Sequence, residues 1–119
     1  MTLNTLGTKA FRDAEANGWH RPKTDESGVV RSTSTPERLA LIHSEVSEAL
    51  EEFRRHGAEA YYGEGGKPEG LAAELADIII RTVELASVFE IDLDFKVDEK
   101  MAYNRHRADV PVRAGGKAL

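Results

Sequence analysis

The chain has 119 residues, of which 40% are hydrophobic and 31% charged, a composition typical of one folded domain and unlike that of a disordered protein. Sixteen lysines and arginines against 21 aspartates and glutamates give a net charge of −5, which disfavours binding to a nucleic acid polymer. No apolar run reaches the length of a membrane span and no secretory signal opens the chain, so we expect a cytoplasmic protein with no membrane partner. The lack of cysteine excludes disulfides, thiolate metal sites and cysteine nucleophiles.

The pattern predicts four helices and no strand. The first covers residues 3–16 and ends at Asn17-Gly18, a frequent C-terminal helix signal. Residues 18–35 begin with Gly18, Trp19 and His20 and are then mostly polar, which predicts a loop.

The second helix begins near Pro36, because Ser34 or Thr35 can cap it and Ser34-x-x-Glu37 has capping-box spacing. It ends by His56-Gly57, and residues 57–70, rich in glycine, predict a turn or mobile loop. Its apolar stripe consists of Leu39, Ile42, Val46, Leu50 and Phe53.

The third predicted helix, residues 68–89, is apolar around much of its circumference, since Ile80 and Val83 lie well away from its main stripe. Such a helix is usually central or covered by a partner chain. Asp92 then caps a fourth helix over residues 93–106, and residues 108–119 predict an irregular tail. We therefore expect one all-α domain over residues 1–119, built as a four-helix bundle.

Two acidic pairs stand out on the second and third helices: Glu45 with Glu48, and Glu74 with Asp77. The i, i+3 spacing turns both carboxylates of a pair to one face, and carboxylates near apolar surface need a cation or a proton. Oxygen ligands from two helices suit Mg²⁺, with Mn²⁺ as the alternative, and no histidine follows a glutamate by three residues as a di-iron bundle requires. The competing interpretation is a pair of solvated helix faces with an Asp77–Arg81 ion pair.

A basic and amide stripe marks the fourth helix. Lys100, Asn104 and Arg107 follow i, i+4, i+7 spacing and continue the face of Leu93 and Val97, so they are placed to face inward and bind phosphate. Alternatively, these cations lie near the helix C-terminus only because the helix dipole stabilises positive charge there.

These motifs resemble the all-α nucleoside triphosphate pyrophosphohydrolases, that is, the MazG-like proteins and relatives of the dCTP pyrophosphatases and dimeric dUTPases. The similar segments are residues 41–50 (LIHSEVSEAL), 74–81 (ELADIIIR) and 99–107 (EKMAYNRHR), and the match spans about residues 36–107 in the family's order.

The resemblance implies Mg²⁺-dependent hydrolysis of a nucleoside triphosphate to a monophosphate and pyrophosphate, a house-cleaning reaction of the nucleotide pool. By motif, the metal ligands and catalytic residues would be Glu45, Glu48, Glu74 and Asp77, while Lys100, Asn104 and Arg107 would contact the substrate. The family also implies a homodimer or homotetramer with its sites near subunit contacts.

Aromatic residues near these motifs are candidates for nucleotide recognition. Trp19 and His20 would stack on or contact the base, and Tyr61 and Tyr62 would close over the ligand; otherwise Trp19 is a core or interface anchor and the tyrosines pack within their loop. Two other functions compete with the enzyme: a non-catalytic helical oligomer that binds nucleotides or proteins, and a structural bundle with solvated acidic faces.

Overall fold

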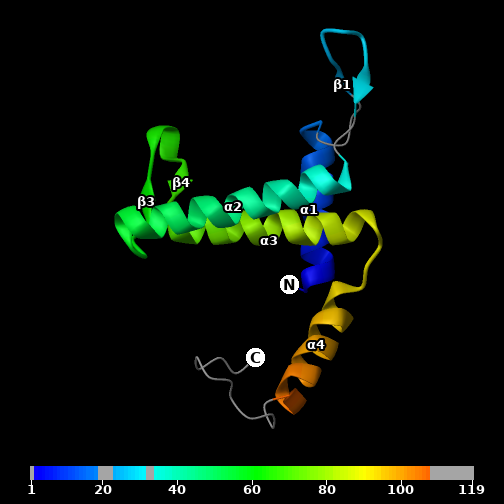
Figure 1. Cartoon of the computed structure of the whole chain (residues 1–119), viewed down its shortest axis with the longest axis vertical. Coiled ribbons are helices and arrows are strands. Elements are labelled where there is room, and N and C mark those ends of the chain that lie inside the picture. The colour runs from blue at the N-terminus through cyan, green and yellow to red at the C-terminus, as the bar shows by residue number, and fades with distance from the viewer. Residues whose placement is uncertain (1, 19–22, 32–33, 108–119) are drawn as a thin grey trace.

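The computed structural model describes residues 2–18, 23–31 and 34–107. Over these residues the chain is mostly helical, which confirms the all-α class (Figure 1). None of the helices in these ranges is long and apolar enough to cross a bilayer. The helices are α1 (Leu3–Ala16), α2 (Thr35–His56), α3 (Leu71–Val88) and α4 (Leu93–Arg107).

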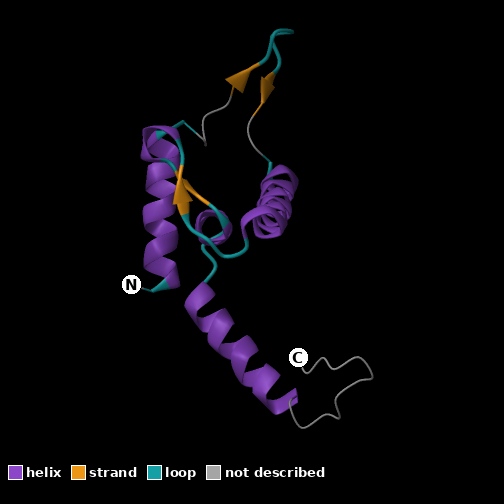
Figure 2. Ribbon diagram, turned by 90° about the vertical axis from the view of Figure 1, so that its left-hand side faces the viewer, coloured by secondary structure: helices purple, strands orange, loops and turns teal. Residues whose placement is uncertain are grey.

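Helix α3 is central: α2 lies along it, and α1 crosses it (Figures 1 and 2). The crossing is close because Gly7 of α1 has no side chain. A Cβ atom at Gly7 would stand 2.6 Å from the carbonyl oxygen of Val83, nearer than any carbon normally approaches. Small buried residues, Ala10 and Ala86, line the same contact. Backbone proximity, rather than large apolar side chains, therefore defines the α1–α3 interface.

Helix α2 packs on α3 through a narrow face that includes the buried residues Glu45 and Ala49. Near its start, Nη1 of Arg38 donates to Oε1 of Glu84 on α3 at 3.3 Å, and both side chains are largely shielded from solvent. The Ser34 cap is confirmed, since its hydroxyl oxygen accepts from the amide of Glu37. Charged groups thus form much of the α2–α3 contact.

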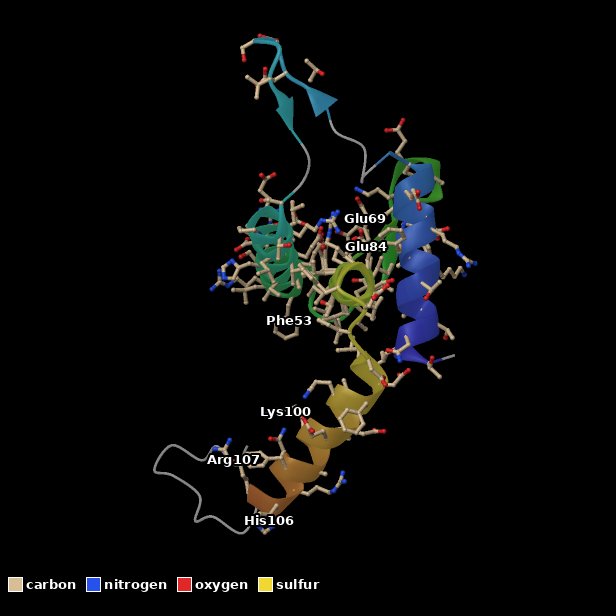
Figure 3. The ribbon with its side chains drawn as sticks, turned by 90° about the vertical axis from the view of Figure 1, so that its right-hand side faces the viewer. Phe53, Glu69, Glu84, Lys100, His106 and Arg107 are labelled. Carbon is tan, nitrogen blue, oxygen red and sulfur yellow. The ribbon has the colours of Figure 1, made fainter. Side chains whose placement is uncertain are left out.

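Four of the five residues in the predicted apolar stripe of α2 do not pack inside the chain, whereas Ile42 is half-buried. Leu39, Val46, Leu50 and Phe53 keep 49–55% of their surface exposed, and Figure 3 shows Phe53 at the surface of α2. Helix α3 is similar, with a further set of half-exposed apolar side chains: Leu75, Ile79, Ile80 and Val88. One copy of the chain therefore leaves a large apolar surface open to solvent, far beyond scattered single residues.

The prediction of no strand is wrong, because both predicted loops contain a short antiparallel hairpin. In residues 18–35, β1 (Lys23–Thr24) pairs with β2 (Val30–Arg31). In residues 57–70, β3 (Tyr61–Tyr62) pairs with β4 (Pro68–Glu69), with a 3-10 turn (Glu64–Gly66) between them. Two-residue strands are too short to produce a detectable alternation of apolar and polar residues.

Helix α3 accordingly begins at Leu71 and not at Pro68. Pro68 and Glu69 belong to β4, and Gly70 has a φ of 99°, which a right-handed helix does not allow. A Cβ on Gly70 would also lie 2.7 Å from the carbonyl oxygen of Glu59. The glycine therefore turns the hairpin directly into the helix that carries Glu74.

Helix α4 begins at Leu93, as predicted, and the Asp92 cap is confirmed by a bond from the amide of Phe95 at 3.1 Å. Its first turn is joined to that of α1 by reciprocal capping: the amide of Leu3 donates to Asp94, while the amide of Leu93 donates to the side chain of Asn4. No residue of α4 is buried, and the helix extends away from the other three (Figure 1).

Candidate metal centre

Three of the four predicted ligands meet between α2 and α3. Glu45 and Glu48 come from successive turns of α2, and Glu74 comes from the first turn of α3. One carboxylate oxygen from each lies within 4.8 Å of the other two. Three oxygens at this separation are a donor set for a hard divalent cation.

Glu45 is the most deeply placed of the three, with a side chain only 10% exposed. Its Oε1 accepts from Nε of Arg81 on α3 at 3.1 Å. Burial opposes the charge of Glu45, but a hydrogen bond with Glu74 and the charge of Arg81 outweigh burial and hold the pKa of Glu45 below its ordinary 4.5. Glu45 is therefore a carboxylate at neutral pH.

Glu74 has the opposite character. Burial, followed by the hydrogen bond to Glu45 and the negative charges of Glu45 and Glu48, raises the pKa of Glu74 to about 7. Its Oε2 is buried and makes no hydrogen bond to any of the described residues. A buried, unsatisfied carboxyl oxygen beside two other carboxylates is the environment in which a bound cation would replace a proton.

Asp77, the fourth predicted ligand, lies outside this group of three. It lines a cavity of about 340 Å³ between α1 and α3, with apolar walls that include Leu6, Ala10 and Ile80. Arg81 lines the same cavity. The second acidic pair is therefore divided: Glu74 faces α2, and Asp77 faces α1.

The basic stripe of α4 does not face the carboxylates within one chain. Lys100 and Arg107 lie on the projecting helix, well away from Glu84 on α3 (Figure 3). They flank the ring of Tyr103, with Nζ of Lys100 5.3 Å and Cζ of Arg107 5.7 Å from its centre. Asn104 is half-buried on the same helix. The expected inward orientation of this stripe is therefore wrong for a single copy, because α4 has no helix to pack against.

The aromatic candidates differ in their placement. Trp19 and His20 lie outside the described residues. The hydroxyl of Tyr61 donates to Glu52 of α2, 2.8 Å from Oε2, which ties the β3–β4 hairpin to the helix and raises the pKa of Tyr61 to about 12. Tyr62 is 74% exposed.

Two contacts at the site were not expected from the sequence. The competing interpretation of the sequence paired Arg81 with Asp77 on its own helix, whereas the structure pairs Arg81 across the interface with Glu45. Glu52 lies seven residues after Glu45 and four after Glu48, so it continues their acidic stripe on α2. Its carboxylate nevertheless accepts from Tyr61 and is not part of the group formed with Glu74. Helical spacing finds neighbours on one helix, but it does not find partners on another.

No family model matches the chain, and comparisons with curated proteins and with solved structures find no match either.

Proposed function

We propose that the chain is a MazG-like nucleoside triphosphate pyrophosphohydrolase that hydrolyses an NTP or dNTP, with Mg²⁺, to the monophosphate and pyrophosphate. The observation that carries the proposal is the convergence of Glu45, Glu48 and Glu74 on one point, where an oxygen of Glu74 is buried without a partner. A solvated acidic helix face would not bury that oxygen, because water satisfies exposed carboxylates at no cost.

The three carboxylates fit Mg²⁺ better than Zn²⁺, since the described ligand group contains oxygen donors alone. Mn²⁺ has similar preferences and is the alternative. When bound, the ion neutralises the triphosphate and orients water for attack. Glu45 would hold it as a permanent carboxylate, and Glu74 would release its proton as the ion enters. One carboxylate that the ion leaves partly unused would accept the proton of the attacking water.

The cavity beside Asp77 is the proposed place for the nucleoside. Arg81, which binds Glu45, also lines this cavity, whose apolar residues suit a flat base and whose lining residues Asn17 and Asp77 offer polar atoms. Trp19 and His20 follow α1 after Asn17 and Gly18, so they are candidates to complete the base site. The contacts within this cavity would decide which base and which sugar the protein binds.

Assembly into a homodimer or homotetramer is part of the proposal. The half-exposed apolar residues of α2 and α3 would be covered by a second copy, as expected for the partly filled bundle. The same assembly would bring Lys100, Asn104 and Arg107 of the projecting α4 toward a carboxylate cluster, where they would bind phosphate. This arrangement explains how a helix without buried residues can carry substrate-binding side chains.

The test is product analysis after incubation with a panel of NTPs and dNTPs, with Mg²⁺ or with chelator. We expect metal-dependent release of monophosphate and pyrophosphate, and a loss of at least about 100-fold in kcat for Glu48→Gln, since it removes a ligand charge. Glu51→Gln is the matched control, because Glu51 lies on the same helix in an exposed pair with Arg54. Release of a diphosphate and inorganic phosphate would keep the metal site and overturn the cleavage position.

The alternative is a non-catalytic helical oligomer that binds nucleotides or proteins. The observation in its favour is that Lys100 and Arg107 lie on the projecting α4, well away from Glu84 on α3 within one copy (Figure 3). Under this alternative, Mg²⁺ and a nucleotide would bind and raise the thermal stability, but no product would form. Turnover by the purified protein decides between the two functions.

A further inference from the structure

Arg81 lies between the two parts of the proposed site. Its Nε contacts Oε1 of Glu45 at 3.1 Å on the α2 side, and its side chain also lines the α1–α3 cavity beside Asp77. The side chain is 28% exposed, whereas that of Glu45 is 10% exposed. The guanidinium is therefore the more exposed partner of the pair, and the carboxylate is the more buried one.

The guanidinium of Arg81 lies beside Glu45, where a metal ion held by the cluster would also lie. A buried carboxylate requires a positive charge nearby, and Arg81 supplies it to Glu45 in the absence of metal. A divalent ion held by Glu45, Glu48 and Glu74 would sit close to the same guanidinium, and two cations repel each other strongly in a partly desolvated site. The metal ion and Arg81 therefore compete for Glu45.

We propose that Arg81 is an exchangeable cation, which pairs with Glu45 in the metal-free protein and turns to the polyphosphate when a divalent ion takes that carboxylate. This role rests on the proposed function, because it requires the cluster to hold a metal. It makes Arg81, the last residue of the similar segment 74–81, a substrate-binding residue, a role that the resemblance did not give it. The same exchange lowers the metal affinity of the empty site and raises it once a polyphosphate is present.

The charges around Arg81 favour this order of events. The cavity wall is mixed, with Asp13, Asp77 and Glu84 beside Lys9 and Arg81, but the cluster on the other helix interface contains carboxylates alone. Those carboxylates would repel a bare polyphosphate, whereas its complex with a divalent ion carries less charge. Arginine suits the second step, since its planar group binds phosphate oxygens in pairs.

The first experiment measures Mn²⁺ binding to the full chain by calorimetry, without nucleotide. We expect Arg81→Gln, which keeps a hydrogen-bond donor but loses the charge, to bind Mn²⁺ about tenfold more tightly than the wild type. Arg81→Lys keeps the charge and should bind like the wild type. Arg54→Gln is the matched control: it removes the same charge from the exposed pair with Glu51 and should change nothing.

The second experiment measures binding of inorganic tripolyphosphate at saturating Mg²⁺, where a nucleoside makes no contribution. Here the effect of the substitution on affinity should reverse. Arg81→Gln should bind tripolyphosphate about tenfold more weakly than the wild type, and Arg81→Lys should recover part of that loss. Thermal unfolding of each variant verifies that it is folded.

The outcomes separate the two proposals. A wild-type chain that binds Mn²⁺ neither alone nor together with tripolyphosphate overturns the proposed function. A wild type that binds Mn²⁺, with Arg81→Gln binding it equally or more weakly, leaves the metal site in place and overturns the exchange, because Arg81 would then only support Glu45. Unchanged tripolyphosphate binding by Arg81→Gln also overturns it.

Discussion

At the scale of single residues, the carboxylates of the cluster divide into opposite states. A hydrogen bond and Arg81 keep Glu45 charged. Burial and the neighbouring charges raise the pKa of Glu74 to about 7, so Glu74 keeps its proton until the pH approaches that value. One proton shared by adjacent acids lets the folded chain exist without a metal. It also makes metal binding depend on pH near neutrality, since the ion must displace that proton.

Glu74 gives a prediction about stability. Its pKa in the folded chain is about 7 and exceeds its ordinary 4.5. Its contribution to the free energy of unfolding is therefore complete below pH 4.5 and is lost as the pH rises through 7. We expect the metal-free protein to lose up to about 3 kcal/mol between these limits, measured by urea unfolding at several pH values. Glu45 does not oppose this trend, because its lowered pKa acts only below pH 4.5.

Glu74→Gln is the control for that experiment, as glutamine is neutral at every pH. Its unfolding free energy should be nearly flat between pH 5 and 8, and it should exceed that of the wild type at pH 8 without divalent ions. The same variant should lose the stabilisation that Mg²⁺ gives to the wild type at pH 8. An equal pH slope in both proteins would contradict the assignment to Glu74.

At the scale of elements, the helices were predictable and their packing was not. Asn17-Gly18 marks the end of α1 and Asp92 caps α4, because caps and stops depend on residues a few positions apart. The convergence of Glu45, Glu48 and Glu74 was likewise anticipated from two i, i+3 pairs. The place of Asp77 beside α1, the Glu45–Arg81 bond and the exposure of Phe53 depend on which faces meet, and one sequence does not contain that information.

Gly7 allows a test of the α1–α3 crossing. In an exposed helix, replacing glycine by alanine stabilises the protein by about 1 kcal/mol. At Gly7 the new methyl group would stand 2.6 Å from the Val83 carbonyl oxygen, so the helices must separate. We expect Gly7→Ala to destabilise the chain by about 1–3 kcal/mol in urea unfolding, since overpacking exceeds the gain in helix propensity. Thr8→Ala, on the exposed side of α1, should change the stability far less.

At the scale of the whole molecule, the chain has too little core for its apolar content. The buried hydrophobic residues in the described part of the chain are small ones: Ala10, Ala49, Val83 and Ala86. Larger side chains lie half-exposed along α2 and α3. A surface of this kind is stable in water chiefly when another copy covers it.

This surface predicts the behaviour of the protein in solution. The wild type should sediment as a dimer or tetramer in analytical ultracentrifugation. Leu50→Asp, on the open face of α2, should shift it toward monomer, because a charge at an apolar contact is strongly unfavourable. Tyr62→Asp, in the β3–β4 hairpin and 74% exposed, is the control and should leave the assembly intact. A wild type that stays monomeric at high concentration would contradict the prediction.

The joint between α1 and α4 has a further consequence, for sequence variation. Asn4 accepts from the amide of Leu93 and donates to Asp92, while Asp94 accepts from the amide of Leu3. Each helix thus depends on side chains about 90 positions away to satisfy its first turn. Substitutions at residues 4, 92 and 94 should therefore occur together, so these three positions form one unit of covariation that sets the direction of α4.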